Sequence, residues 1–188
     1  QQNRLRTLGA SRLDLESLSP LLSRSIPLFV HVNRRSDIRT MLRIADTYRI
    51  RMVILGGAEA WMEADALASA RVPVIMNPIQ NQPSTFDAIH SRDDAATILT
   101  NAGVKVAFST FSAHDVRKLR QWAGNAVRSG LTHSQALMSI TQHPAEILGL
   151  TTHGKIQTGA IANLVVWSGD PFEVSSRVLH LFIRGKMV

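Results

Sequence analysis

The stretch PLFVHVNRRSDIRTMLRIADTY, residues 27–48, decides the fold class. It opens with a short run that is apolar almost throughout, which is typical of a strand buried on both faces of a parallel sheet. Ser36 then stands where a helix N-cap is expected. A helix over 36–48 places Ile38 and Leu42 on one face, so it has a side that can be buried. The stretch therefore predicts one strand followed by one helix.

The same pattern recurs along the middle of the chain. Three further apolar runs are RMVILGG at 51–57, VPVIM at 72–76 and VKVAFST at 104–110. Helical patterns follow them at 58–70, 92–101 and 114–129, the last with Gly130 as its C-cap. We therefore expect parallel strands near 28–32, 51–55, 72–76 and 104–108. The fold class is α/β, with about four βα units that correspond to half of a (β/α)8 TIM barrel of about 250 residues.

Both ends of the chain extend this core. A helix is expected at 14–24, and 133–148 predicts helices divided at Pro144, with starts at Thr132 and His143. The tail contains two apolar runs about an Asp-Pro turn, which predicts a β-hairpin from a small appendage. We expect residues 1–150 to form the partial barrel, with the fifth to eighth strands, and residues 151–188 to form the C-terminal β segment.

Composition excludes several classes of function. The 188 residues carry a formal charge of +7, but their 21 Lys and Arg are scattered rather than gathered in a stripe, so nucleic-acid binding is not expected. No apolar stretch approaches the roughly 20 residues that a membrane span needs, so a soluble protein of the cytoplasm or periplasm is expected. The chain has no cysteine, which excludes disulfides and thiolate metal sites.

Two motifs near the end are the most specific in the chain. TQHPAEILGL at 141–150 resembles a Thr-x-Asn-Pro-Ala-x-x-Leu-Gly segment, and LVVWSGDPF at 164–172 resembles the strand and turn that follow it. With the strand order, they make residues 12–188 similar to the C-terminal half of the amidohydrolase superfamily, above all its imidazolonepropionase-like and prolidase-like branches. The resemblance implies hydrolysis of C–N bonds, in non-peptide or dipeptide amides, with one or two divalent metals such as zinc.

The same resemblance names the metal ligands that this half should supply. They are a histidine after the fifth strand, a histidine after the sixth and an aspartate after the eighth. His31 matches the first, but Gly56 and Phe111 stand at the other two positions, and neither side chain has a donor atom. The resemblance thus implies a degenerate metal site. Zinc is expected from the family, and we expect this chain to lack it.

Further site residues are predicted around these positions. Asn33 stands in place of the second polar residue of the fifth-strand motif, and with His114 it is a candidate for substrate binding. Asp115 would replace the missing catalytic aspartate if its loop is remodelled, or it would help to cap the following helix. His31 would be a metal ligand, or a histidine at the rim of the core that bonds a strand-end carbonyl.

A weaker signal is LGGAE at 55–59. A strand, two glycines and a helix start can expose backbone N–H groups to an anion, but close packing explains the glycines equally well. Arg34 and Arg35 would bind a carboxylate substrate by bidentate hydrogen bonds, or they would be solvated.

Two hypotheses of function remain. The first is a hydrolase of C–N bonds acting on a small molecule, inactive as this isolated fragment and completed by a missing N-terminal half or by another chain. The second is a non-catalytic homologue that binds a small molecule or has a structural role. Half a barrel exposes sheet edges at 28–32 and 104–108, so we expect a homo-oligomer or association with the missing half. The expected exposed inner layer is Leu28, Val30, Val53, Val74 and Val106.

Overall fold

The computed structural model describes residues 11–80, 82–83 and 85–188. It is an α/β fold with a parallel sheet of four strands, in the order β1-β2-β3-β4, and an antiparallel sheet of three. The parallel strands are β1 (Leu28–Val32), β2 (Met52–Gly56), β3 (Val74–Met76) and β4 (Val106–Phe108). All four predicted strands and their parallel pairing are confirmed. Continuous apolar runs separated by helical segments are typical of strands buried in a parallel sheet.

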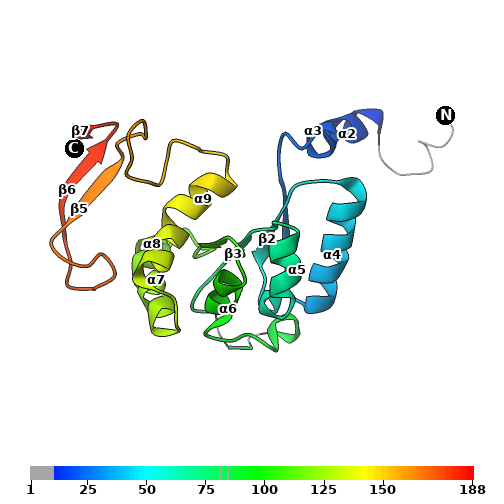
Figure 1. The fold of residues 1–188 in the computed structure, drawn as a ribbon, viewed down its shortest axis with the longest axis horizontal. Helices are drawn as coiled ribbons and strands as arrows, with labels where there is room; N and C mark the ends of the chain where they lie inside the picture. The colour runs from blue at the N-terminus through cyan, green and yellow to red at the C-terminus, as the bar shows by residue number, and fades with distance from the viewer. Residues whose placement is uncertain (1–10, 81, 84) are drawn as a thin grey trace.

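Helices follow each of these strands and lie along the sheet in chain order (Figure 1). They are α4 (Arg35–Tyr48), η1 (Ala60–Glu63), α5 (Ala64–Ser69), α6 (Ala95–Asn101), η3 (Val116–Lys118) and α7 (Leu119–Arg128). The long loop after β3 contains the short helix η2 (Phe86–Ala88). The single helix predicted over 58–70 is wrong in detail, since a 3-10 turn precedes a short α-helix there.

The helices outside the four units also differ from the prediction at their ends. The expected helix at 14–24 is divided into α2 (Arg12–Ser17) and α3 (Ser19–Leu22). Thr132 caps α8 (His133–Ile140) in a capping box with Gln135, as its position predicts. The next break lies at Thr141 rather than at Pro144. Because the first turn of a helix tolerates proline, Pro144 sits inside α9 (Gln142–Ile147) and His143 does not begin it.

The main core lies between the sheet and its helices. Val30, Ile54, Val74 and Val106 form one row across the four strands, and this row packs with helix residues that include Ile38, Leu67 and Leu99. The expected inner layer is therefore wrong for Leu28, Val30, Val74 and Val106, which belong to this core. The opposite face carries Val53, Ile75 and Ala107, and Ile147 of α9 packs against them. The expected exposure is therefore wrong for Val53 as well, because it is buried on this face.

The tail forms the antiparallel sheet, from β5 (Leu164–Trp167), β6 (Val178–Ile183) and β7 (Lys186–Met187). The predicted hairpin is present and has a third strand. In Figure 1 this sheet lies beyond α7 and α8, on the side away from β1. Arg120 of α7 donates hydrogen bonds of 2.6 Å to the carbonyls of Pro171 and Glu173. Phe172 enters the main core, so the turn between β5 and β6 is anchored to α7.

Among the described residues, no helix combines the length and the apolar character needed to cross a bilayer.

Candidate functional site

The candidate site lies at the carboxyl ends of β1, β2 and β4. The His31 side chain projects from β1 on the face opposite the main core and is exposed. A Cβ atom added to Gly56 would lie 3.3 Å from His31 Nε2, and the Phe111 ring lies edge-on to the His31 ring with their centroids 6.4 Å apart. The three positions at which the resemblance places metal ligands therefore meet in space.

The side chains at these positions do not make a metal site. Of the three, His31 alone has an atom that can bind a divalent metal. In the described part of the chain there is no group of three or more His, Cys, Asp or Glu residues that could hold an ion. A divalent metal needs several converging donors, so the residues present here do not fit one without ligands from outside this chain.

The loop after β2 is hydrogen-bonded to the carboxyl end of β1 and the residue that follows it. The N–H groups of Gly57, Ala58 and Glu59 donate to the Val32 carbonyl at 2.8 Å, to Asn33 Oδ1 at 3.4 Å and to the Asn33 carbonyl at 2.9 Å. A Cβ on Gly57 would lie 3.1 Å from Ala60 Cβ and 3.2 Å from Val74 Cγ1, at a φ of +64°. Close packing thus explains this glycine. The predicted anion cradle is wrong, because its N–H groups already have partners.

Glu59 is a buried charged residue near this edge of the sheet, and the sequence did not reveal it. Its side chain is buried, and its carboxylate accepts hydrogen bonds from the Arg35 N–H at 2.8 Å and from His90 Nδ1 at 2.7 Å. Burial raises the pKa of Glu59, but these hydrogen bonds and the charge of His90 together outweigh it, so the pKa lies below its usual value. Glu59 stays ionised at neutral pH and joins β2, α4 and the long loop after β3.

The same contact corrects the predicted start of α4. Ser36 is not the N-cap, because the helix begins one residue earlier and Arg34 stands at the cap position without a side-chain capping bond. Ser36 Oγ instead donates to Asp37 Oδ1 at 3.2 Å. The carboxylate of Glu59 takes the place of a local cap, from 24 residues further along the chain.

Arg34 faces the long loop after β3. Its Nε atom lies 2.6 Å from Asp87 Oδ1, and both side chains are about half exposed. It also lines a cavity of about 550 Å³, together with Arg35, Ser36, Arg39, Glu59, Phe86 and Ile89. A ligand carboxylate would have to compete with Asp87 for this guanidinium, at a small cost because exposed ion pairs are weak.

His114 and Asp115 lie in the loop after β4, and His114 is exposed. Asp115 Oδ1 accepts a hydrogen bond of 2.8 Å from Lys118 Nζ. The Lys118 hydrogen bond, with smaller help from Ser112, keeps the pKa of Asp115 below its usual value despite partial desolvation. The Asp115 side chain makes no capping hydrogen bond to η3. Its partner is the Lys118 ammonium group, with which it forms an ion pair.

The chain matches known proteins over most of its length. A model described as the amidohydrolase family matches residues 30–188. The solved structure of an amidohydrolase from Thermotoga maritima MSB8 superposes with a TM-score of 0.87 at 30% identity, over 100% of this chain and 50% of that one. A curated relative, amidohydrolase tasK of Hapsidospora irregularis, is 40% identical over 111 residues, which cover 54% of this chain and 11% of the relative.

A third similarity is to a zinc-containing structure. A mutant of atrazine chlorohydrolase from Arthrobacter aurescens TC1, complexed with zinc and atraton, superposes with a TM-score of 0.62 at 17% identity, over 93% of this chain and 46% of that one. At this identity the likeness concerns the fold. The chain spans about half the length of these solved structures and 11% of the curated relative. Because the family model covers most of its residues, the chain belongs to the amidohydrolase family.

Proposed function

We propose that the complete protein hydrolyses C–N bonds, amides above all, in a small-molecule substrate, and that this chain alone does not. Membership of the amidohydrolase family supports the reaction class. One observation supports the proposal that this chain alone is inactive. The three ligand positions converge, and His31 alone among them has a donor atom. A divalent metal such as zinc would then take His31 as one ligand and the others from outside this chain.

In this proposal the chain supplies half of a TIM barrel and one wall of the active site. Asn33 and His114 would contact substrate, Arg34 would bind a substrate carboxylate, and Asp115 would accept a proton. What supports these roles is position: each residue follows a strand at its carboxyl end, the edge where α/β-barrel enzymes carry their catalytic groups. The lowered pKa of Asp115 keeps its carboxylate ionised, which is the state that can accept a proton.

A second function is favoured by one specific observation. Gly56 and Phe111 stand where the resemblance places metal ligands. Beside His31 there are instead the Phe111 ring and the Asn33 amide, whose Oδ1 would lie 2.6 Å from a Cβ at position 56. Such a site would bind a small molecule without hydrolysing it. The protein would then be a non-catalytic homologue with a binding or structural role.

Complementation separates the two functions. We expect the isolated chain with zinc to show no turnover of dipeptides or p-nitroanilide amides. When it is mixed with the segment of the Thermotoga maritima amidohydrolase that it does not cover, the hydrolase proposal predicts turnover, which His31→Ala abolishes. Turnover by the isolated chain would contradict the proposal. Binding of the two segments without turnover would favour the non-catalytic function.

Association is the second expected property of the isolated chain. β1 and β4 are the edges of the parallel sheet, but His143 Nδ1 lies 2.7 Å from the Val106 carbonyl and so protects β4. β1 is less protected, and its residue Phe29 is 39% exposed. An open strand edge with an apolar side chain favours pairing with a second copy.

We expect sedimentation at micromolar concentration to show a dimer or larger species. Phe29→Asp should shift it towards the monomer of 20.7 kDa, because a charge on the contact face opposes burial. Phe86→Asp is the matched control, since Phe86 is also exposed but lies in the loop after β3. A monomeric wild-type chain, or equal effects of both variants, would contradict pairing through β1.

A further inference from the structure

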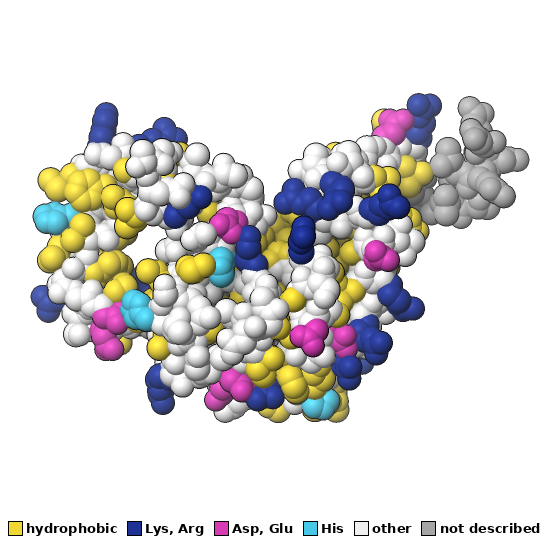
Figure 2. Space-filling model, in the orientation of Figure 1, with side chains coloured by type: hydrophobic (Ala, Val, Ile, Leu, Met, Phe, Trp, Pro, Cys, Tyr) yellow, Lys and Arg dark blue, Asp and Glu magenta, His cyan; other side chains and the backbone are white. Residues whose placement is uncertain are grey.

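A cavity of about 680 Å³ lies at the amino ends of the strands, at the opposite end of the sheet from His31. Its lining comes from the residues just before β1, β2, β3 and β4, and from α4, α5 and α9. Figure 2 shows Lys and Arg side chains around a hollow near the top of this face of the molecule. The basic residues that line the cavity are Arg24, Arg49, Arg51, Arg71 and Lys105, and the acidic ones are Asp46 and Glu146.

Three of these arginines occupy strained backbone positions. Arg24, Arg49 and Arg71 have φ values of +60°, +52° and +53°, in the left-handed region that disfavours residues with a Cβ. Each follows a helix and makes the same turn, in which its N–H bonds a carbonyl three residues back and the next N–H bonds one five residues back.

Glycine fills the same turn elsewhere in this chain. Gly103, Gly130 and Gly149 have positive φ and the same pair of hydrogen bonds. Glycine adopts this conformation without steric cost, and it is the usual residue at the end of a helix. All three positions that carry arginine line one cavity, which Gly103 also lines, whereas Gly130 and Gly149 do not line it. Arg24, Arg49 and Arg71 thus adopt the left-handed backbone conformation, which arginine disfavours, at positions that all line the same cavity.

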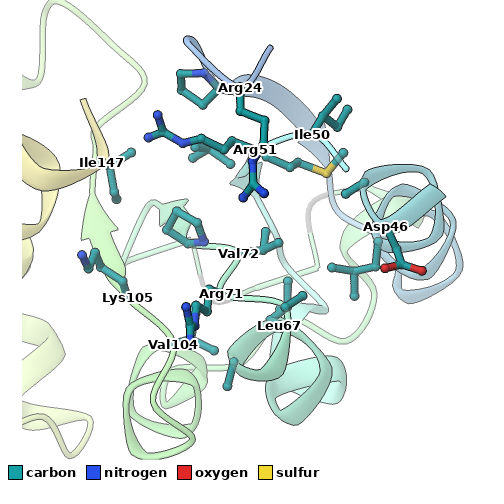
Figure 3. A pocket seen from close by; sticks show the side chains of 18 of the residues that line it. Arg24, Asp46, Ile50, Arg51, Leu67, Arg71, Val72, Val104, Lys105 and Ile147 are labelled. Atoms are coloured by element: carbon teal, nitrogen blue, oxygen red, sulfur yellow. The ribbon is translucent and has the colours of Figure 1, made fainter. Parts of the chain in front are cut away.

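The arginine side chains in this space have no ion-pair partner among the described residues, although Asp46 and Glu146 also line it. Lys105 Nζ lies 2.6 Å from Glu146 Oε2, so these two form an ion pair. The side chains of Arg24, Arg49, Arg51 and Arg71 form no ion pair or hydrogen bond with any residue that the structure describes. In Figure 3, Arg24, Arg51, Arg71 and Lys105 surround one space whose wall includes Leu67, Val72 and Val104.

We propose that this cavity binds a small molecule that carries two or more phosphate groups on an apolar body. Guanidinium groups match phosphate oxygens by bidentate hydrogen bonds, and several of them around one space favour more than one phosphate. The apolar wall accounts for the body, and the volume lies in the range of small-molecule sites. The site is separate from the proposed catalytic edge, so it does not depend on hydrolysis.

Calorimetric titration of the full chain with ADP, pyrophosphate and adenosine tests the site. We expect ADP to bind more tightly than pyrophosphate, adenosine not to bind, and ADP affinity to fall as salt rises. Arg49→Gly/Arg71→Gly should weaken ADP binding at least about tenfold. Because glycine relieves the left-handed strain, this variant should unfold at the same temperature as the wild type or higher.

Arg184→Gly is the matched control. Arg184 has a φ of +51° and the same charge, but it lies in the turn between β6 and β7 and does not line the cavity. It should relieve the same strain and leave ADP binding unchanged. No binding of ADP or pyrophosphate by the wild type, or an equal loss of binding in Arg184→Gly, would overturn the proposal. Equal affinities for ADP and pyrophosphate would overturn the apolar part of the assignment.

Discussion

Gly154→Ala should destabilise the protein by about 2–5 kcal/mol, from left-handed strain and overpacking together. Gly154 has a φ of +78°, and a Cβ atom there would overlap the Thr141 carbonyl oxygen and lie 2.8 Å from Gln142 Cα. These are backbone atoms at the junction of α8 and α9, so they cannot turn aside as a flexible side chain would. Urea unfolding followed by circular dichroism measures the loss.

Gly159→Ala provides the control for backbone strain. Gly159 has a similar φ of +85°, but a Cβ there would meet no atom within 4 Å. This variant should therefore lose about 1 kcal/mol, the cost of a left-handed residue alone. If both variants lost the same stability, that result would contradict the close contact between residue 154 and the backbone at the start of α9.

Glu59→Ala should cost about 2–4 kcal/mol, because it removes both a helix cap and a charged hydrogen bond in a buried place. The Arg35 N–H and His90 would each lose the carboxylate that they now contact. Asp94→Ala is the control, since Asp94 pairs with Arg92 at the surface and should lose less than about 1 kcal/mol. Thermal and urea unfolding of the two variants give the comparison.

The effect of Glu59 should also depend on pH in a defined direction. Its pKa in the folded protein lies below the ordinary value of 4.5, so its stabilising effect is fully present above that pH. The effect is lost as pH falls through the folded pKa, when the carboxyl becomes protonated. The stability difference between wild type and Glu59→Ala should therefore shrink on going from pH 7 to below pH 4.5. A difference that grew on acidification would contradict an ionised Glu59.

The fold was predictable from the sequence because each strand is a short apolar run that ends in a helix signal. Which face each side chain occupies was not. Val53 and Ile54 are both apolar, and a strand buried on both faces has no alternation to show that Ile54 packs on the helices while Val53 packs on Ile147. The residues that fill the inner layer therefore required the structure.

The candidate site divides in the same way. The resemblance to the family named His31, Gly56 and Phe111 as three ligand positions, and these positions lie close together in the structure. The Glu59 contacts could not be predicted, since they join residues that lie 24 and 31 positions apart without a motif. The local sequence favoured Ser36 as the N-cap of α4. In the structure the buried carboxylate of Glu59, from the next βα unit, accepts the hydrogen bond at the start of this helix.

Zinc titration of the isolated chain tests the central claim most directly, namely that its own residues do not form a divalent metal site. The chain is first stripped with a chelator and then titrated in a calorimeter, with zinc content measured after gel filtration. We expect no stoichiometric zinc, and the same trace for wild type and His31→Ala, because Gly56 and Phe111 supply no donor beside His31. One equivalent of zinc retained by the wild type and lost in His31→Ala would contradict the account.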